Sequence, residues 1–309
     1  MPTSGRSPAP GIFTGMHASL DELTLDARNS SSPAMARGIM TEAQDLLRNA
    51  LDHGESERAL AHWFSRTLQE LMGSPALVEL VDSARLLPTG ALARGDATPT
   101  DTVTWIIVGF SVGGNERVGG LFAGAGLPVG ELRAPASPEV WRERVDEAVE
   151  KRDVAEIEMF VDCGLLTGPT PADLLATASL GHLPPTLRLA EGLPDYSTPV
   201  DVRGILLEPA VAVARWAGLL ADATGGDVAH RLSAAADRDV LTADEAEALT
   251  QAWDTGLTLE LRRWRHHAWD DSTMLSSLPA LDRSAYGAAA RLVSVALRSL
   301  AGRRGVDMP

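Results

Sequence analysis

Apolar residues recur at helical spacing through the first part of the chain. From Pro33 onward, apolar positions three and four residues apart predict a helix, and they include Met40, Ala43, Leu46, Leu47 and Leu51. The same spacing predicts a second helix over 55–72 and a short third helix over 75–83. Residues 1–32 are rich in Ser, Pro and Gly and lack a sustained period, so we expect a disordered or loosely attached arm there.

The middle of the chain changes to a pattern typical of strands that alternate with helices. β-rich apolar runs predict three strands, over residues 86–90, 104–110 and 157–162. The last of them is expected to end in the carboxylate of Asp162. Ser137 followed by Pro138 is a usual helix start, and the charged residues after them extend this helix to 151. We therefore expect a mixed α/β domain over about 85–165.

Beyond residue 200 the pattern is helical again. Four helices are expected, starting at Pro209, Asp227, Thr242 and Asp282. Thr242 and Glu245 have the spacing of a capping box. The helix that they start is long, with an apolar stripe made of Ala246, Leu249, Trp253, Leu257, Leu261 and Trp264. Four antiparallel helices with short links predict a bundle, and Pro184-Pro185 and residues 192–200 are the expected linker that precedes it.

Composition narrows the class of protein. The formal net charge of −15 speaks against nucleic acid or an anionic membrane as the main partner, because proteins bind both through Lys and Arg. The single cysteine, Cys163, excludes an internal disulfide. The apolar runs fall short of the ~20 residues that a membrane helix needs, and a secretory signal is not recognised. We therefore expect a cytoplasmic protein without a nucleic-acid or membrane partner.

The stretch between the first two expected strands carries the candidate chemistry. It reads Gly90-Ala91-Leu92-Ala93-Arg94-Gly95-Asp96-Ala97-Thr98-Pro99-Thr100-Asp101-Thr102-Val103-Thr104. Its layout resembles the signature of the polymerase-β-type nucleotidyltransferases, in which a strand and a Gly-Ser turn precede a Ser-Asp-x-Asp that opens the next strand. Four residues match that pattern, namely Gly90, Arg94, Thr98 and Asp101.

Two further regions carry the resemblance, which covers about 35–302. Met159-Phe160-Val161-Asp162 is similar to a strand of the family that ends in Phe-Phe-Asp. Several short C-terminal motifs follow the family in order and spacing, namely Asp201-Val202-Arg203-Gly204, Pro209, Ala214-Arg215 and His230-Arg231-Leu232. The chain thus resembles nucleotidyltransferases related to protein-PII uridylyltransferase and glutamine-synthetase adenylyltransferase, including their helical substrate-binding domain.

The resemblance implies an α+β fold and a metal-dependent reaction. It implies a small mixed sheet of a polymerase-β-type core with flanking N-terminal helices over 33–190, followed by an all-α four-helix bundle over 200–303. The reaction would transfer a nucleoside monophosphate from a nucleoside triphosphate to a protein or other acceptor, with Mg²⁺ or Mn²⁺ as cofactor. Asp101 and Asp162 would be the catalytic carboxylates and metal ligands. The residues that would face the phosphates are Gly90, Ala91, Arg94, Thr98 and Thr100.

The signature is altered at two positions that matter for this chemistry. Residues two apart on a strand share a face, so the family's two aspartates can hold metal together, but Val103 stands at the second position and offers no oxygen. Ala91 stands where the family has Ser, which removes a hydroxyl from the phosphate turn. Two hypotheses follow. One is a nucleotidyltransferase with weakened or lost transfer. The other is a non-catalytic nucleotide-sensing or scaffold protein that binds a partner through its helical bundle.

A second group of candidate metal ligands is His266-His267 with Asp270-Asp271. Adjacent histidines on a helix point about 100° apart, so they seldom bind the same ion. A solvated helix end is the favoured interpretation of these residues.

Overall fold

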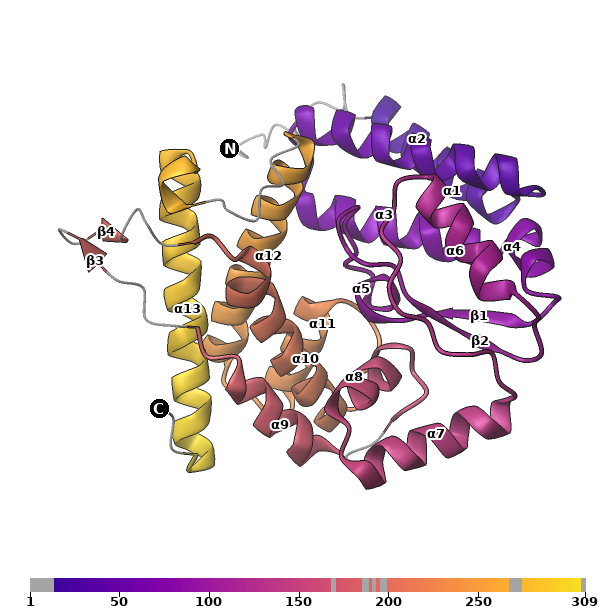
Figure 1. Cartoon of the computed structure of the whole chain (residues 1–309). Helices are drawn as coiled ribbons and strands as arrows, with labels where there is room; N and C mark the ends of the chain where they lie inside the picture. Colours follow the sequence, from indigo (N-terminus) through magenta and orange to yellow (C-terminus); the bar gives the residue numbers. More distant parts are fainter. Residues whose placement is uncertain are drawn as a thin grey trace, which may run out of the picture.

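Helices make up most of the molecule, in two groups that meet at a central junction (Figure 1). The computed structural model describes residues 14–167, 171–184, 189–190, 193–194, 199–266 and 274–306. We call residues 14–167 the N-terminal half and residues 171–306 the C-terminal half. The N-terminal half holds the only extended pairing of more than two residues among the described residues, so the expected small sheet is present but reduced.

The first helices of the N-terminal half follow the predicted apolar stripes. They are α2 (Pro33–Asp52), α3 (Glu57–Met72) and α4 (Pro75–Leu80). Each begins after a serine whose side chain accepts a hydrogen bond from a backbone N–H of the first turn, namely Ser32, Ser56 and Ser74. Such caps satisfy backbone donors that a helix start leaves free, and they fix where each helix begins.

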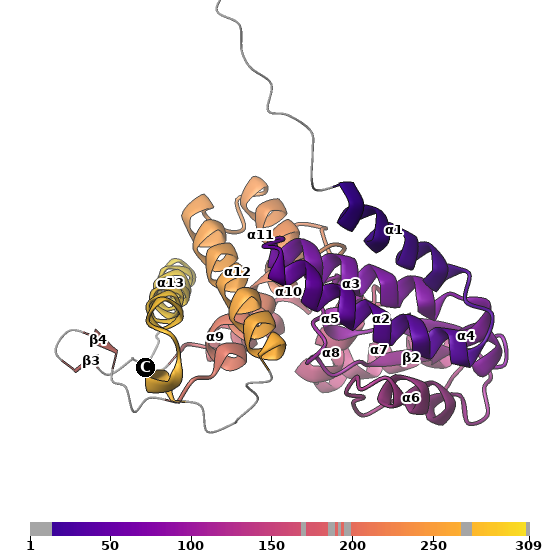
Figure 2. The same cartoon turned by 90° about the horizontal axis from the view of Figure 1, so that it is seen from above.

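The prediction of a disordered arm is wrong for its second part, because Thr14–Arg28 forms helix α1. Leu20, Leu23 and Ala27 are buried, and α1 packs along α3 and α2 (Figure 2). These residues have the spacing of one helical face, which the surrounding Ser, Pro and Gly obscured. Trp63 of α3 strengthens the contact, since its Nε1–H donates to the carbonyl of Leu20 over 2.9 Å.

The expected strands over 86–90 and 104–110 are present as β1 (Arg85–Pro88) and β2 (Trp105–Val108). They pair antiparallel, with Leu87 opposite Ile106. Two isolated parallel bridges, Val103 to Val129 and Val108 to Ala136, lie along β2. The sheet is therefore two-stranded with a loosely paired third segment, where the sequence predicts a mixed sheet of at least three strands.

The predicted third strand is wrong, because residues 157–162 belong to helix α8 (Val154–Asp162). Asp153 caps this helix by accepting from the N–H of Glu156. Ile157, Phe160 and Val161 are spaced by three and four residues, so the same apolar run also fits one helical face, which is fully buried. Helix α7 (Pro138–Lys151) precedes it and confirms the prediction that Ser137 caps a charged helix.

The remaining helices of the N-terminal half are short. Helix α5 (Gly90–Arg94) follows β1 directly, and α6 (Gly114–Gly124) follows β2. Gly90 adopts a positive φ of 58°, a conformation that favours glycine and lets the chain turn sharply from β1 into α5. This turn points α5 at the junction between the halves.

The C-terminal half is helical, as predicted. Its elements are α9 (Ala172–Gly181), the π-helical turn η1 (Arg203–Leu207), α10 (Glu208–Leu220), α11 (Val228–Asp237), α12 (Ala243–Arg265), the short turn η2 (Leu275–Ser277) and α13 (Ala280–Arg304). Thr242 and Glu245 form the predicted capping box of α12. Helix α9 packs against α10, so the expected bundle of four helices describes only part of this half.

Two details of the C-terminal half differ from expectation. Asp282 lies within the first turn of α13 and accepts from Arg262, while Pro279 occupies the cap position. In the expected linker, β3 (Leu189–Ala190) pairs with β4 (Leu193–Pro194), and residues 185–188, 191–192 and 195–198 lie outside the described part.

Two apolar cores meet near the junction. One lies mainly in the N-terminal half and includes Val103 and Trp105. The other joins α9–α13 to α7 and α8, through Trp141 and Phe160. Helix α8 thus belongs to the N-terminal half in sequence and packs in the core of the C-terminal half.

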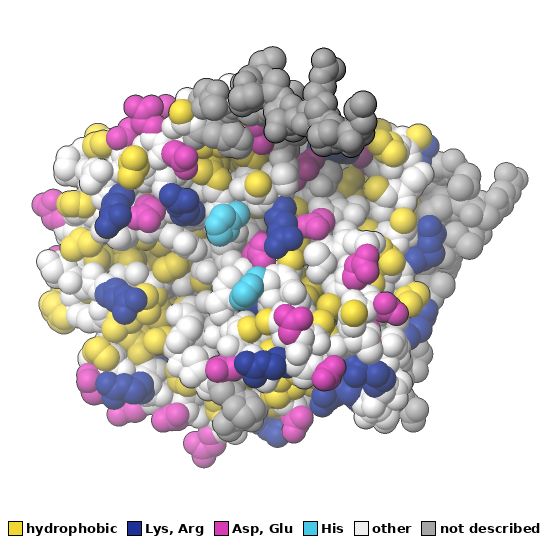
Figure 3. Space-filling model, turned by 180° about the vertical axis from the view of Figure 1, so that it is seen from behind, with side chains coloured by type: hydrophobic (Ala, Val, Ile, Leu, Met, Phe, Trp, Pro, Cys, Tyr) yellow, Lys and Arg dark blue, Asp and Glu magenta, His cyan; other side chains and the backbone are white. Residues whose placement is uncertain are grey.

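Acidic and basic side chains are interspersed over the face seen from behind (Figure 3). Within the described helices, none combines the length and apolarity that a membrane span requires.

Candidate functional site

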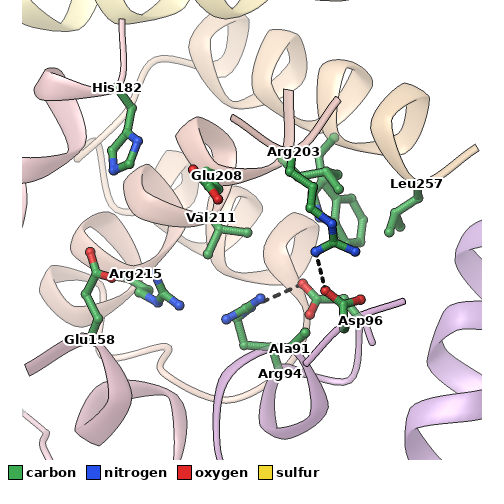
Figure 4. A pocket seen from close by; sticks show the side chains of 13 residues that line it. Ala91, Arg94, Asp96, Glu158, His182, Arg203, Glu208, Val211, Arg215 and Leu257 are labelled. Carbon is green, nitrogen blue, oxygen red and sulfur yellow. Dashed lines mark hydrogen bonds and ion pairs between the residues drawn. The ribbon is translucent and has the colours of Figure 1, made fainter. Parts of the chain in front are cut away.

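A cavity of about 290 Å³ lies where the two halves meet. The N-terminal half contributes α5, the loop after it and Glu158 of α8. The C-terminal half contributes η1, α10, α12 and His182. The lining residues are Ala91, Arg94, Asp96, Asp101, Glu158, His182, Arg203, Leu207, Glu208, Val211, Arg215, Trp253 and Leu257 (Figure 4). The structure therefore brings three of the predicted site residues, Ala91, Arg94 and Asp101, to one cavity.

Asp162, one of the two predicted catalytic carboxylates, does not line this cavity and lies in a cluster of three arginines. Arg94 Nη1 donates to its Oδ2 over 2.6 Å, and Arg215 donates to the same oxygen over 3.0 Å from Nε and 2.7 Å from Nη2. Arg231 Nη1 donates to Oδ1 over 3.0 Å. The Asp162 side chain is 0% exposed.

Electrostatics fixes the charge state of Asp162. Burial by itself would raise the pKa of the carboxyl, but the guanidiniums of Arg94, Arg215 and Arg231 outweigh it and bring the pKa to about 2. The carboxylate is thus fully ionised near neutral pH, and its oxygens are occupied by N–H donors. Because Arg94 ends α5, Arg215 lies on α10 and Arg231 on α11, this cluster ties the two halves together.

Asp101, the other predicted metal ligand, is held from two sides. Its Oδ2 accepts from the backbone N–H of Thr98 over 2.7 Å and from the Thr98 hydroxyl over 2.8 Å. Its Oδ1 accepts from Arg203 Nη1 over 2.5 Å. Arg203 also donates to the Thr100 hydroxyl over 3.0 Å and pairs with buried Glu260 over 3.4 Å. Thr98 and Thr100, predicted to face phosphates, are therefore engaged with Asp101 and Arg203.

Val103 is part of the apolar floor under the loop. Its side chain belongs to the N-terminal core, and the residue is 3% exposed. Its backbone N–H donates to the carbonyl of Pro128 over 2.8 Å, and its carbonyl accepts from Gly130 over 3.1 Å. Position 103 consequently faces packed carbon atoms.

Asp96 is a lining carboxylate that is not among the predicted site residues. It is 4% exposed, and its Oδ2 accepts from Arg94 Nε over 3.2 Å. Its Oδ1 is buried and has no hydrogen-bond partner among the described residues. Burial raises the pKa of Asp96 to about 6, against the opposing effect of Arg94. Asp96 thus carries an unsatisfied acceptor.

The predicted phosphate turn keeps its backbone geometry. Gly90 has the positive φ noted above, and Ala91 lines the cavity. A Cβ added to Gly90 would lie 3.7 Å from the Thr104 hydroxyl, so conformation rather than space restricts this position. Arg94, predicted to face phosphate, directs its guanidinium to Asp96 and Asp162 instead.

These donors do not fit a pair of divalent cations. Mg²⁺ needs several oxygen ligands in octahedral geometry, and a two-metal site needs carboxylates that both ions can reach. Here Asp162 is surrounded by guanidiniums, Asp101 is held by Thr98 and Arg203, and position 103 is apolar. In the part of the chain that the structure describes, no three His, Cys, Asp or Glu side chains gather to hold a metal ion.

Sequence reasoning did not assign roles to the arginines of the C-terminal half. Arg203, Arg215 and Arg231 were noted only as parts of short motifs, and those motifs were the available signal. Their carboxylate partners lie 53 to 102 residues away in the chain, a separation that local patterns do not report. Residues 267–271 of the His and Asp group considered above lie outside the described residues.

A comparison with protein families finds a match in the C-terminal half. Residues 181–303 match the family described as "Putative nucleotidyltransferase substrate binding domain". The match includes η1 and α10–α13, and with them Arg203, Arg215 and Arg231. It supports a relation to the nucleotidyltransferases and a nucleotidyltransferase-like function. No curated protein matches the chain.

Proposed function

We propose that this chain is a nucleotidyltransferase-like protein, related to the protein-uridylylating and protein-adenylylating enzymes, that binds a nucleotide in the cavity without metal-dependent transfer. The cavity lies against the half that matches a nucleotidyltransferase substrate-binding domain. The cluster around Asp162 is the observation that carries the second part of the proposal. Three guanidiniums surround Asp162, the carboxylate to which the resemblance assigns a metal ion.

In this arrangement, arginines neutralise the carboxylates that metal ions would otherwise neutralise. A divalent cation neutralises carboxylates and phosphates, and a guanidinium does the same with fixed geometry and no exchangeable ligand. Asp101 is paired with Arg203, and Asp162 is paired with Arg94, Arg215 and Arg231, so neither carboxylate that the resemblance assigns to metal is free to recruit Mg²⁺. An acceptor hydroxyl would then lack the activation that transfer requires.

The lining of the cavity offers contacts for both parts of a nucleotide. Leu207, Val211, Trp253 and Leu257 form an apolar surface from the C-terminal half, suited to the face of a base. Charged side chains also line the cavity, and the most exposed guanidinium among them is that of Arg203, whose side chain is 36% exposed. A guanidinium carries five N–H donors, so Arg203 can donate to a phosphate while it stays paired with Asp101.

Isothermal titration calorimetry in EDTA tests nucleotide binding. Mono- and triphosphates of adenosine, guanosine, cytidine and uridine are titrated into the full chain. We expect saturable binding of at least one nucleotide, weakened about tenfold or more by Arg203→Ala. Arg142→Ala is the matched control, because Arg142 pairs with Glu139 on an exposed helix surface. Failure of every nucleotide to bind would overturn the proposal and leave the scaffold hypothesis, in which the helical half contacts a protein partner.

A further inference from the structure

Asp96 Oδ1 is an acceptor that a ligand can satisfy. Oδ2 of the same carboxyl is paired with Arg94, while Oδ1 is buried and has no partner among the described residues, and Asp96 lines the cavity. A buried acceptor without a donor is unfavourable, and more so when it is charged. Proteins therefore satisfy such atoms, and a ligand can supply the donor where the chain does not.

The neighbouring donors are already in use. Arg94 Nη1 donates to Asp162, and Arg203 donates to Asp101 and Thr100. Arg215 donates to Asp162 and Glu158. Figure 4 shows Arg94 and Arg203 turned toward carboxylates at the floor of the cavity, beside Asp96. None of these side chains donates to Asp96 Oδ1, and Asp96 lines the cavity, so a ligand bound there can supply the donor.

The charge of the lining restricts what can enter. Four carboxylates, those of Asp96, Asp101, Glu158 and Glu208, face three guanidiniums, those of Arg94, Arg203 and Arg215. A metal-free triphosphate would bring several negative charges to a lining that is already slightly acidic. A ligand with one phosphate and neutral hydroxyl donors meets less repulsion. The cavity volume of about 290 Å³ lies near the lower end for small-molecule sites, which also favours a small nucleotide.

We infer that the cavity takes a ribonucleoside monophosphate, and that Asp96 Oδ1 accepts a hydrogen bond from a ribose hydroxyl. This inference rests on the proposed function and specifies its ligand. The phosphate binds Arg203, the base lies on the apolar surface near Val211 and Leu257, and the sugar faces Asp96. Asp96 then distinguishes ribose from deoxyribose, because a deoxy sugar leaves the buried oxygen unpaired.

Calorimetry with matched sugars tests this role. The monophosphate that binds most tightly is compared with its 2′-deoxy and 3′-deoxy analogues and with the free nucleoside. For the unmodified protein we expect one of the two deoxy analogues to bind about tenfold or more weakly than the ribonucleotide. In Asp96→Asn the difference shrinks, because the acceptor becomes neutral. In Asp96→Ala it disappears. The isosteric Asn variant keeps the test valid if the Ala variant does not fold.

Glu139→Gln is the control variant. Glu139 is an exposed carboxylate that pairs with Arg142 and does not line the cavity, so its removal changes the net charge of the protein without changing the binding site. We expect this variant to keep the full preference for ribose. Equal binding of ribo and both deoxy monophosphates by the unmodified protein, or a preference that persists in both Asp96 variants, would overturn the inference.

The failures of the two proposals are distinguishable. If triphosphates bind and monophosphates do not, the ligand inference is wrong and nucleotide binding stands. If no mono- or triphosphate binds, both are wrong. If the free nucleoside binds as tightly as the monophosphate, the assignment of the phosphate to Arg203 is wrong, and the inference is overturned in that form.

Discussion

The guanidinium of Arg231 on α11 and the carboxylate of Asp162 on α8 are both removed from solvent, with side chains 1% and 0% exposed and 3.0 Å between Nη1 and Oδ1. Arg94 and Arg215 share the same carboxylate. A buried charge is tolerated when partners surround it, and removing one member leaves the others uncompensated. We therefore expect the contact between the two halves to depend on the negative charge of Asp162.

Asp162→Asn is expected to destabilise the protein strongly. Three buried or half-buried guanidiniums would lose their shared counter-charge, so the free energy of unfolding should fall by about 3–5 kcal/mol. Urea denaturation followed by circular dichroism measures the change. Glu139→Gln, which breaks an exposed pair with Arg142, is the control and should change stability by less than about 0.5 kcal/mol. A loss for Asp162→Asn as small as that of the control would contradict a structural role for the cluster.

The raised pKa of Asp96 predicts a dependence of stability on pH with a definite sign. Its pKa rises from an ordinary 3.8 to about 6 in the folded protein, so the folded state holds the proton more tightly between these values. The contribution of Asp96 to stability is then greatest below pH 4 and is lost as the pH rises through 6. The change is on the order of 3 kcal/mol.

The measurement compares the unmodified protein with Asp96→Asn by urea denaturation at several pH values. Because other carboxyls titrate in the same range, the difference between the two proteins isolates Asp96. This difference should move in favour of the Asn variant between pH 4 and 6. A difference that is constant with pH, or that moves the other way, would rule out a buried Asp96 of raised pKa.

Arg203→Ala is expected to loosen the loop between α5 and β2. Arg203 holds Asp101, and Asp101 in turn accepts from the backbone N–H of Thr98. Without the guanidinium this amide should exchange with solvent several-fold faster, with a stability loss of about 1 kcal/mol. Hydrogen exchange, followed by mass spectrometry or NMR, measures both the exchange rate of this amide and the loss of local stability. Arg117→Ala, whose ion pair with Asp82 lies apart from the cavity, should leave the exchange of Thr98 unchanged. Equal exchange in both variants would disprove the link.

Val103→Asp restores the aspartate of the family signature and is expected not to restore a metal site. The new carboxylate would be placed in packed carbon, where an unpaired charge costs several kcal/mol. Val103→Ala removes volume without adding charge, so it should be clearly less destabilising than Val103→Asp. Thermal denaturation compares the variants, and calorimetry with Mg²⁺ tests for metal binding. A stable Val103→Asp protein that binds Mg²⁺ would contradict our description of this position.

Local signals in the sequence predicted most of the helices correctly. Ser137 and the pair of Thr242 with Glu245 mark helix starts within a few residues, because each satisfies backbone donors nearby. Helix α8 was mispredicted because Ile157, Phe160 and Val161 fit either period, and only packing against the C-terminal half decides between them. Helix α1 was missed because its composition resembles a flexible arm.

The candidate site was predictable only in part. The stretch from Gly90 to Val103 led to the cavity, because its glycine turn and polar residues are close together in the chain. The partners of Asp162 were not predictable, because Arg94, Arg215 and Arg231 come from three separate helices. A carboxylate after an apolar run looks the same in sequence whether a metal or a guanidinium faces it. The distinction appears only when the helices are placed side by side.

The absence of metal dependence is the central claim, and one titration tests it most directly. The nucleotide that binds in EDTA is titrated again in the presence of Mg²⁺, with the unmodified protein and with Asp101→Ala, while released pyrophosphate is assayed. We predict dissociation constants that agree within about threefold with and without Mg²⁺, and no pyrophosphate above background from triphosphates. Binding that requires Mg²⁺ and is lost in Asp101→Ala, accompanied by pyrophosphate release, would show a working metal site and contradict the account.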